Sequence, residues 1–390
     1  MNGQPGSAPI YLDHAATTPV APEVIAAMND CLADVRRCAN PSSIHVAGRA
    51  AAAACEDARS ALAVLLNVAP RDLVWTSGAT ESDNLAIVGA ARARRHRGRH
   101  LVTLTTEHKA VVDTFRALTK DGFDVTWLTP GADGRLDLAE LEQALRHDTQ
   151  LVSVMHVNNE TGAVQDIEAI GRLCRDRDVL YHCDAAQSVG KLPLDLAALP
   201  VDLVSLTAHK FHGPPGIGAL YIAPRSGVVV EPLLHGGGQQ QRRRPGTLPG
   251  HLIVGCGVAA GLATASQGDD LAHVESLRDT LWAGIRGLPG LTLNSPPTGG
   301  YPGILNVSAT GVEGESLLLA LEPLCVATGA ACNSLSGEPS YVLRALGRSD
   351  EEAQSAIRFS FGRDTTRADI EFAAAVYTSA VERLRALAPG

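Results

Sequence analysis

The sequence predicts an α/β protein with a large domain, in which helices cover a mostly parallel seven-stranded sheet, and a smaller α+β domain. The first observation behind this prediction is an alternation of short apolar runs and helical segments between residues 72 and 222. The second is that the apolar runs are nearly continuous, which is typical of strands buried on both faces. The third is that a Gly/Pro/Gln/Arg-rich connector at 223–250 precedes residues 267–390, which have shorter strands and helices of their own.

The expected elements follow from these patterns in chain order. Residues 21–67 are expected to be helical, because the Ala-rich stretch 46–67 has high helix propensity throughout. The apolar runs are expected as strands at 73–76, 101–104, 125–128, 151–157, 179–183, 201–206 and 218–222. Helices are expected between most of them, near 82–96, 109–120, 137–146 and 166–177. After the connector we expect a helix over 251–266, strands at 292–293, 304–307 and 357–361, and a final helix over 367–387.

The predicted domain organisation has three parts. Residues 1–20 form an N-terminal segment that joins the small domain, residues 21–265 form the large domain, and residues 266–390 form the small domain. A chain of 390 residues is long enough for two such domains.

Composition and charge disfavour several classes of protein. The net charge is −9 and the arginine clusters are short, so direct nucleic-acid binding is not expected. The eight cysteines include no C-x-x-C pair, which argues against a structural zinc site, and their spacing does not resemble a disulfide framework. The N-terminus is polar, and no apolar run reaches the ~18 residues of a membrane span. We therefore expect a cytoplasmic protein without a membrane segment.

Polar residues follow several predicted strands, at the edge where ligands bind in doubly wound sheets. They include Lys210 among glycines and prolines, Asp184, His108, and the small residues 77–82 at the start of a helix. Each has a structural alternative: an exposed Lys in a surface turn, an Asp in a core salt bridge, and helix caps at the other two places. Together they fit one ligand, pyridoxal phosphate, which needs a Lys, an Asp at its ring nitrogen, an imidazole over its ring and a phosphate site.

Longer motifs carry a family resemblance. They are Tyr-Leu-Asp-His-Ala-Ala-Thr-Thr at 11–18, Gly-Ala-Thr-Glu-Ser at 78–82, Thr-Glu-His at 106–108, His-Val-Asn-Asn-Glu-Thr-Gly at 156–162 and His-Cys-Asp-Ala-Ala-Gln at 182–187. Through them the chain resembles the cysteine desulfurases, fold-type-I pyridoxal-phosphate enzymes related to class V aminotransferases. The resemblance extends from Tyr11 to Arg363.

The resemblance implies pyridoxal 5′-phosphate as the cofactor and assigns residues to it. Lys210 would form the Schiff base and move the Cα proton, and Asp184 would pair with the ring nitrogen. His108 would stack on the ring and shuttle protons, and Gln187 would contact the ring hydroxyl. The residues implied around the phosphate are Ala79, Thr80, Thr207 and His209, with Thr247 reaching the phosphate of the other subunit of a homodimer.

The resemblance also implies the substrate, L-cysteine, and its contacts. Asn159 and Arg358 would hold the substrate carboxylate, and an Arg in an apolar strand suits a planar anion. Cys332 lies in a loop of small and polar residues, which suits a mobile segment, and its spacing to Arg358 resembles the long-loop group of the family. Its thiolate would take the sulfur as a persulfide, leaving alanine, and pass it to an acceptor protein, either a scaffold or a sulfurtransferase. No metal site is expected, apart from Cys332 as a candidate transient ligand of a cluster.

Several readings stay open from the sequence. The acceptor pathway could be iron–sulfur cluster assembly, DNA phosphorothioation or tRNA thiolation. A selenocysteine lyase or another class V enzyme is the alternative within the fold, and a non-catalytic subunit is disfavoured because both Lys210 and Cys332 are present. Two departures from the family lie at Pro215, where a Lys is usual, and at residues 238–244, where Glu and Gly are usual.

Overall fold

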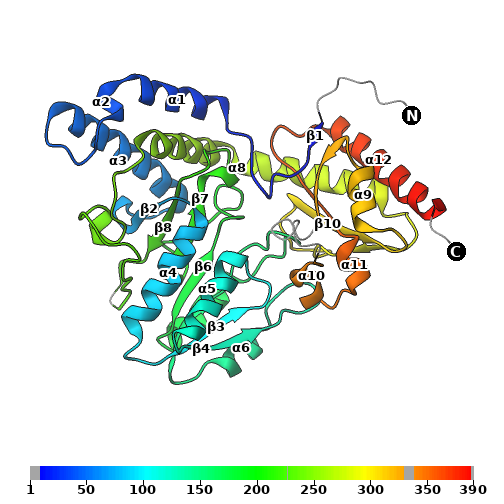
Figure 1. Ribbon diagram of the computed structural model, residues 1–390, viewed down its shortest axis with the longest axis horizontal. Coiled ribbons are helices and arrows are strands. Elements are labelled where there is room, and N and C mark those ends of the chain that lie inside the picture. The colour runs from blue at the N-terminus through cyan, green and yellow to red at the C-terminus, as the bar shows by residue number, and fades with distance from the viewer. Residues whose placement is uncertain (1–8, 226, 329–337, 388–390) are drawn as a thin grey trace.

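The computed structural model describes residues 9–225, 227–328 and 338–387. Two bodies of secondary structure lie side by side, and the long helix α8 (Gly250–Ile285) runs from one to the other (Figure 1). One body is built on a seven-stranded sheet and the other on a four-stranded sheet.

The large sheet has the strand order β2-β8-β7-β6-β5-β3-β4. Strands β3 to β7 run parallel where they pair, whereas β8 is antiparallel to both of its neighbours, so the predicted mostly parallel seven-stranded sheet is confirmed. The strands are β2 (Leu73–Thr76), β3 (His100–Leu104), β4 (Asp124–Leu128), β5 (Thr149–Ser153), β6 (Leu180–Asp184), β7 (Leu203–Thr207) and β8 (Gly218–Ile222).

Helices cover both faces of this sheet because alternate strand residues point to opposite sides. Trp75, Val152 and Tyr181 pack in one apolar cluster, whereas Val74 and Leu151 pack in another on the opposite face. The first face is covered by α1 (Pro22–Ala33), α3 (Val46–Leu66), α6 (Leu138–Ala144), α7 (Ile167–Asp176) and the start of α8. The second is covered by α4 (Ala79–Arg94) and α5 (Lys109–Lys120), and the short α2 (Val35–Cys38) precedes α3.

The small sheet is antiparallel, in the order β12-β13-β10-β9. Its strands are β9 (Leu291–Leu293), β10 (Ile304–Ala309), β12 (Ala327–Thr328) and β13 (Ile357–Ser360). A further pair, β1 (Ile10–Tyr11) with β11 (Leu324–Cys325), ties the N-terminal segment to this body. The remaining helices are α9 (Gly314–Ala320), α10 (Tyr341–Ala345), α11 (Asp350–Gln354) and α12 (Arg367–Leu387).

Helix α8 is longer than the sequence pattern predicted. We expected a helix over 251–266, but it continues for 36 residues to Ile285. Its first part packs in the core of the large sheet, and Val274, Leu277 and Leu281 face the second core at helical spacing. The predicted boundary at 265/266 therefore falls inside a helix that belongs to both cores. We propose to keep the domain boundary at this point, because the apolar residues of α8 pack in the core of the large sheet before it and in the second core after it.

Strand β5 is shorter than predicted. It ends at Ser153 instead of Val157. The next residues leave the ladder but still bond to the neighbouring strand, with the His156 amide donating to the Asp184 carbonyl oxygen at 3.0 Å. This turn brings the polar loop 157–162 toward the end of β6.

None of the described helices is long and apolar enough to cross a membrane.

Candidate active site

A cavity of about 470 Å³ lies at the carboxyl ends of the parallel strands, closed on one side by β13 of the small body. Ten of the residues predicted for the site line it. They are Ala79, Thr80, His108, Asn159, Asp184, Gln187, Thr207, His209, Lys210 and Arg358. The structure thus brings together residues that are up to about 280 positions apart in the chain.

Among the described residues, Thr247 is the predicted site residue that does not line the cavity. Cys332 lies in the segment 329–337, outside the described residues. Pro215, the first departure from the family, does line the cavity and is exposed at its mouth.

Lys210 ends the short 3₁₀ turn that follows β7. Its Nζ donates to the carbonyl oxygens of Ala15 and Ala16, at 2.5 and 2.7 Å. Both acceptors belong to the N-terminal motif at 11–18, so this segment holds the amine at the cavity floor.

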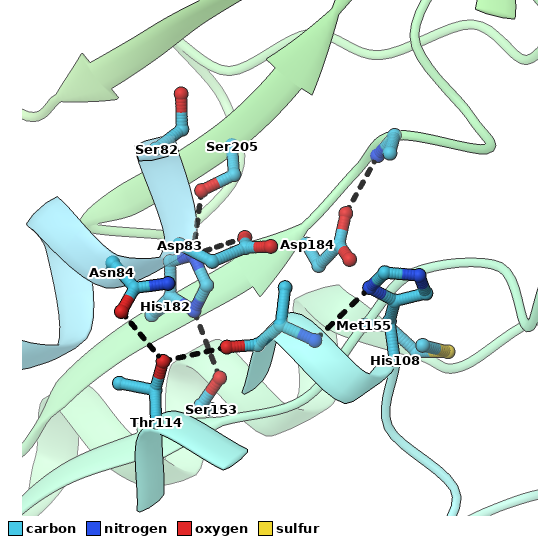
Figure 2. A network of polar contacts seen from close by, with 12 residues as sticks. Ser82, Asp83, Asn84, His108, Thr114, Ser153, Met155, His182, Asp184 and Ser205 are labelled. Atoms are coloured by element: carbon cyan, nitrogen blue, oxygen red, sulfur yellow. Dashed lines mark hydrogen bonds and ion pairs between the residues drawn. The ribbon is translucent and has the colours of Figure 1, made fainter. Parts of the chain in front are cut away.

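Asp184 is the last residue of β6 and is buried. One carboxylate oxygen accepts the amide of Ala186 at 2.8 Å (Figure 2). Burial raises the pKa of this carboxyl, and the nearby charges of His108 and Lys210 oppose the shift. A buried carboxylate of this kind gains stability from a cationic hydrogen-bond donor in the cavity.

A second carboxyl lies behind Asp184, on helix α4. Asp83 is fully buried, and burial together with the charge of Asp184 raises its pKa well above the ordinary value. It lies 3.6 Å from Nε2 of His182, whose ring also contacts the hydroxyls of Ser153 and Ser205 at 2.8 and 2.9 Å (Figure 2). Burial lowers the pKa of His182 to about 3, so its ring is neutral at pH 7. His182 therefore supplies no positive charge to offset a negative charge on Asp83.

His108 caps helix α5. Its Nδ1 accepts the amide of Ala110 at 3.2 Å, which leaves the proton of a neutral ring on Nε2 (Figure 2). The cap fixes the ring at the edge of the cavity. The sequence alternatives for His108, a helix cap or a ring-stacking group, therefore do not exclude each other.

Helix α4 presents its N-terminus to the cavity beside Thr80. The preceding Gly78 has φ 151°, a conformation that favours glycine. Strand β8 approaches it closely at Gly218, where a side-chain Cβ would lie only 2.7 Å from the Cα of Gly78. The first turn of a helix has backbone N–H groups without helical partners and a positive end of the dipole, which suit an anion. His209 lies on the same side, and burial lowers its pKa to about 4, so the ring is neutral there.

One carboxylate also lies at this edge. Glu81 accepts the amide of Ser77 at 2.7 Å and pairs with Arg244 at 2.8 Å. Arg244 is the last residue of the second departure from the family, 238–244, in which Gln240 accepts both Nη1 of Arg59 at 3.1 Å and the amide of Trp75 at 3.0 Å. The changed segment is therefore anchored to the large sheet, and its Arg244 neutralises Glu81 next to the anion site.

Arg358 comes from β13 and is almost fully buried. Its Nη1 donates to the carbonyl oxygen of Asn159 at 2.8 Å, and its Nη2 pairs with Asp13 at 2.7 Å. Its Nε has no hydrogen-bond partner among the described residues. The guanidinium is thus positioned from both bodies while part of its donor set stays unsatisfied.

Sequence reasoning assigned no role to three polar residues of the site. Asp13 lies in the N-terminal motif but gave no signal that it would pair with Arg358. Glu160 is buried and lines the cavity, and burial raises its pKa to about 7. Lys191 was not singled out, and it donates to Gln187. Asp13 and Glu160 contact the distant residues Arg358 and Ser340, which spacing along the chain does not show, whereas Lys191 contacts a residue only four positions earlier.

The donor set fits pyridoxal phosphate. A phosphate suits the helix N-terminus after Gly78, a protonated ring nitrogen suits the buried Asp184, and a carbonyl carbon suits the amine of Lys210. By contrast, the described residues hold no group of three or more His, Cys, Asp or Glu side chains that could bind a metal ion.

Known proteins are similar to this chain along nearly its whole length. A model of the aminotransferase class-V family matches residues 10–372. Cysteine desulfurases named IscS are 52% identical in Enterobacter sp. (strain 638) and 53% identical in Pseudomonas aeruginosa (strain LESB58), each over 382 residues that cover 98% of this chain and 95% of the relative. The structure of a NifS-like protein has a TM-score of 0.89 at 35% identity, covering 96% of this chain and all of its own. SspA in complex with cysteine has a TM-score of 0.79 at 38% identity, covering 92% of this chain and all of its own.

These matches agree with the resemblance expected from the motifs, which already ran from Tyr11 to Arg363. The chain belongs to the class-V aminotransferase family, whose members are pyridoxal-phosphate enzymes.

Proposed function

We propose that this protein is a cysteine desulfurase that removes sulfur from L-cysteine and leaves L-alanine. The observation that carries the proposal is the convergence of Lys210, Asp184, His108 and Arg358 on one cavity. Relatives named cysteine desulfurase at 51–53% identity over 98% of the chain support it, as does a similar structure described with cysteine.

We propose pyridoxal phosphate as the cofactor. Lys210 would bond to it, Asp184 would keep its ring nitrogen protonated, and Gln187 would donate to its ring hydroxyl. Its phosphate would lie at the start of helix α4, near Ala79, Thr80, Thr207 and His209. When bound, the cofactor supplies an electron sink for the bond pair at Cα of the amino acid.

The chain's own groups would bind and orient the substrate. The carboxylate of L-cysteine would take the remaining donors of Arg358, beside Asn159, and it would do so in a site already fixed by the pair with Asp13. This bond would orient Cα toward Lys210. Lys210, once its amine is released from the Ala15 and Ala16 carbonyls, would carry the Cα proton. His108, with its Nε2 proton, would exchange a proton at the substrate side of the ring.

The sulfur would leave on Cys332. Its thiolate attacks the substrate sulfur, so one S–S bond forms, the C–S bond breaks, and the electron pair stays on carbon, where a proton completes alanine. We propose that an acceptor protein then collects the persulfide sulfur and that the enzyme is a homodimer in which Thr247 completes the partner's phosphate site. We propose iron–sulfur cluster assembly as the pathway, because the IscS relatives are more similar to this chain than SspA at 38% or the DndA of Streptomyces lividans at 37%.

The test is the formation of alanine and sulfide from L-cysteine by the purified protein with pyridoxal phosphate and a thiol reductant. We expect Lys210→Ala to abolish both products together with the absorbance of the bound cofactor. We expect Cys332→Ala to abolish both products while the absorbance of the bound cofactor remains. If Cys332→Ala forms sulfide at the wild-type rate, the persulfide route is wrong.

A further inference from the structure

Lys191 lies behind the cavity, four residues after Gln187. Its Nζ donates to Oε1 of Gln187 at 2.9 Å and lies 5.6 Å from the ring centroid of Tyr301. Among the described residues, no carboxylate lies within ion-pair distance of this amine. Burial, together with the positive charges of Lys210 and Arg358, lowers its pKa well below the ordinary value. Removing a lysine amine from water without a carboxylate partner costs folding free energy. The contact between Lys191 and Gln187 therefore needs an explanation.

The amide of Gln187 is held at both ends. Its Nε2 donates to the carbonyl oxygen of Ala15 at 2.7 Å, the same oxygen that accepts from Lys210. A carbonyl oxygen only accepts, so this contact requires the NH₂ end on that side. The amine of Lys191 donates on the other side, which requires the oxygen end there. The two contacts therefore select one of the two amide orientations.

That orientation matters because Gln187 is buried and lines the cavity. One N–H of Nε2 is used by Ala15, and the amide retains a second N–H. With the amide reversed, the cavity would face an acceptor instead of a donor, and a ligand oxygen that carries negative charge would meet repulsion.

We propose that Lys191 is a positioning residue that holds the Gln187 amide with its N–H toward the cavity, so that it donates to the phenolic oxygen of the bound cofactor. The inference rests on the proposed cofactor and assigns a role to a residue outside the contact set. Removal of Lys191 would let the amide turn, and the phenolic oxygen would lose a donor and become more basic.

The test is a double-mutant cycle on the protein loaded with pyridoxal phosphate, read by absorbance against pH. The measured quantity is the pKa of the proton shared by the Lys210 nitrogen and the phenolic oxygen. We expect Lys191→Met to raise this pKa by about one unit, roughly the effect of one hydrogen bond to a charged group. We expect Gln187→Leu to raise it as well. In the Gln187→Leu background, Lys191→Met should cause no further shift.

The cycle separates positioning from simple charge. If Lys191 acts only as a nearby cation, its removal shifts the pKa equally in both backgrounds, and the inference is overturned. An unchanged pKa in Lys191→Met also overturns it. Lys109→Met is the matched control, because Lys109 lines the same cavity but has no described bond to Gln187. Its effect should be the same in both backgrounds.

Two further readouts make the outcome unambiguous. Lys191→Leu, which also lacks a donor for Gln187, replaces Lys191→Met in the same cycle if that variant does not fold. The thermal midpoint of the cofactor-free Lys191→Met protein should stay within a few degrees of wild type, since an amine without a carboxylate partner is replaced by an apolar side chain of similar length. If the unsubstituted protein forms no cofactor absorbance, the proposed function fails. If it forms one and the cycle shows no coupling, only the inference about Lys191 fails.

Discussion

Glu160 provides a quantitative test of the site, because its carboxyl is buried at the cavity wall. The hydroxyl of Ser340 donates to Oε2 at 2.5 Å, and the charges of Arg358 and His108 favour the ionised form. Burial outweighs them and raises the pKa from 4.5 to about 7. Between pH 4.5 and about pH 7, the folded chain therefore keeps a proton on Glu160 that the unfolded chain has lost.

The sign of the pH effect follows from this difference. A carboxyl whose pKa is higher in the folded state contributes its full stability at a pH below its pKa in the unfolded chain. That stability is lost as the pH rises through its pKa in the folded chain. At about 1.4 kcal/mol per pKa unit, the loss between pH 5 and pH 8 is on the order of 3 kcal/mol. An unfolding entropy of about 2.1 cal/mol/K per residue gives about 0.8 kcal/mol/K for a chain of this length, so the Tm difference is about 4 °C.

The perturbation is Glu160→Gln, which keeps the size and an acceptor for Ser340 but cannot ionise. The assay is the thermal midpoint of the cofactor-free protein at pH 5 and pH 8, at one protein concentration. Wild type should lose about 4 °C more than Glu160→Gln over this interval. Glu382→Gln, at an exposed position on α12, is the control and should follow wild type. Parallel changes in wild type and Glu160→Gln would refute the argument that Glu160 is buried as a neutral acid.

Two other predictions concern residues at the edge of the site. Asp13→Ala removes the partner of Nη2 of Arg358, so the guanidinium should lose its orientation. We expect KM for L-cysteine to rise about tenfold in steady-state assays, with kcat changed less. An unchanged KM would argue against binding of the substrate carboxylate at Arg358. Arg242 is exposed and has φ 66°, within the segment that departs from the family. Arg242→Gly should therefore stabilise the protein by about 0.5–1 kcal/mol in thermal unfolding, whereas Arg243→Gly, at φ −88°, should destabilise it.

The fold was predictable to a large extent because its strands are buried on both faces. Continuous apolar runs give a clear signal for such strands, and β2 and β8 have the predicted bounds. The end of β5 and the length of α8 were mispredicted. Apolar residues continue past the end of β5, and the sequence between 266 and 285 contains no proline that would stop a helix. In both places packing against a neighbouring element, and not local propensity, sets the boundary.

The sequence by itself determined which groups the site could use, since motifs at strand ends named Lys210, Asp184, His108 and the start of helix α4. It could do so because parallel strands end at one edge of the sheet, so residues after successive strands meet there. Only the tertiary structure decided how these groups are held. The pairing of Asp13 with Arg358 and the buried state of Glu160 arise from contacts between segments far apart in the chain. The Gln187 amide, which Lys191 contacts from four residues away, is also held by the distant carbonyl oxygen of Ala15. Burial and distance set these charges and orientations, and neither is encoded in a local motif.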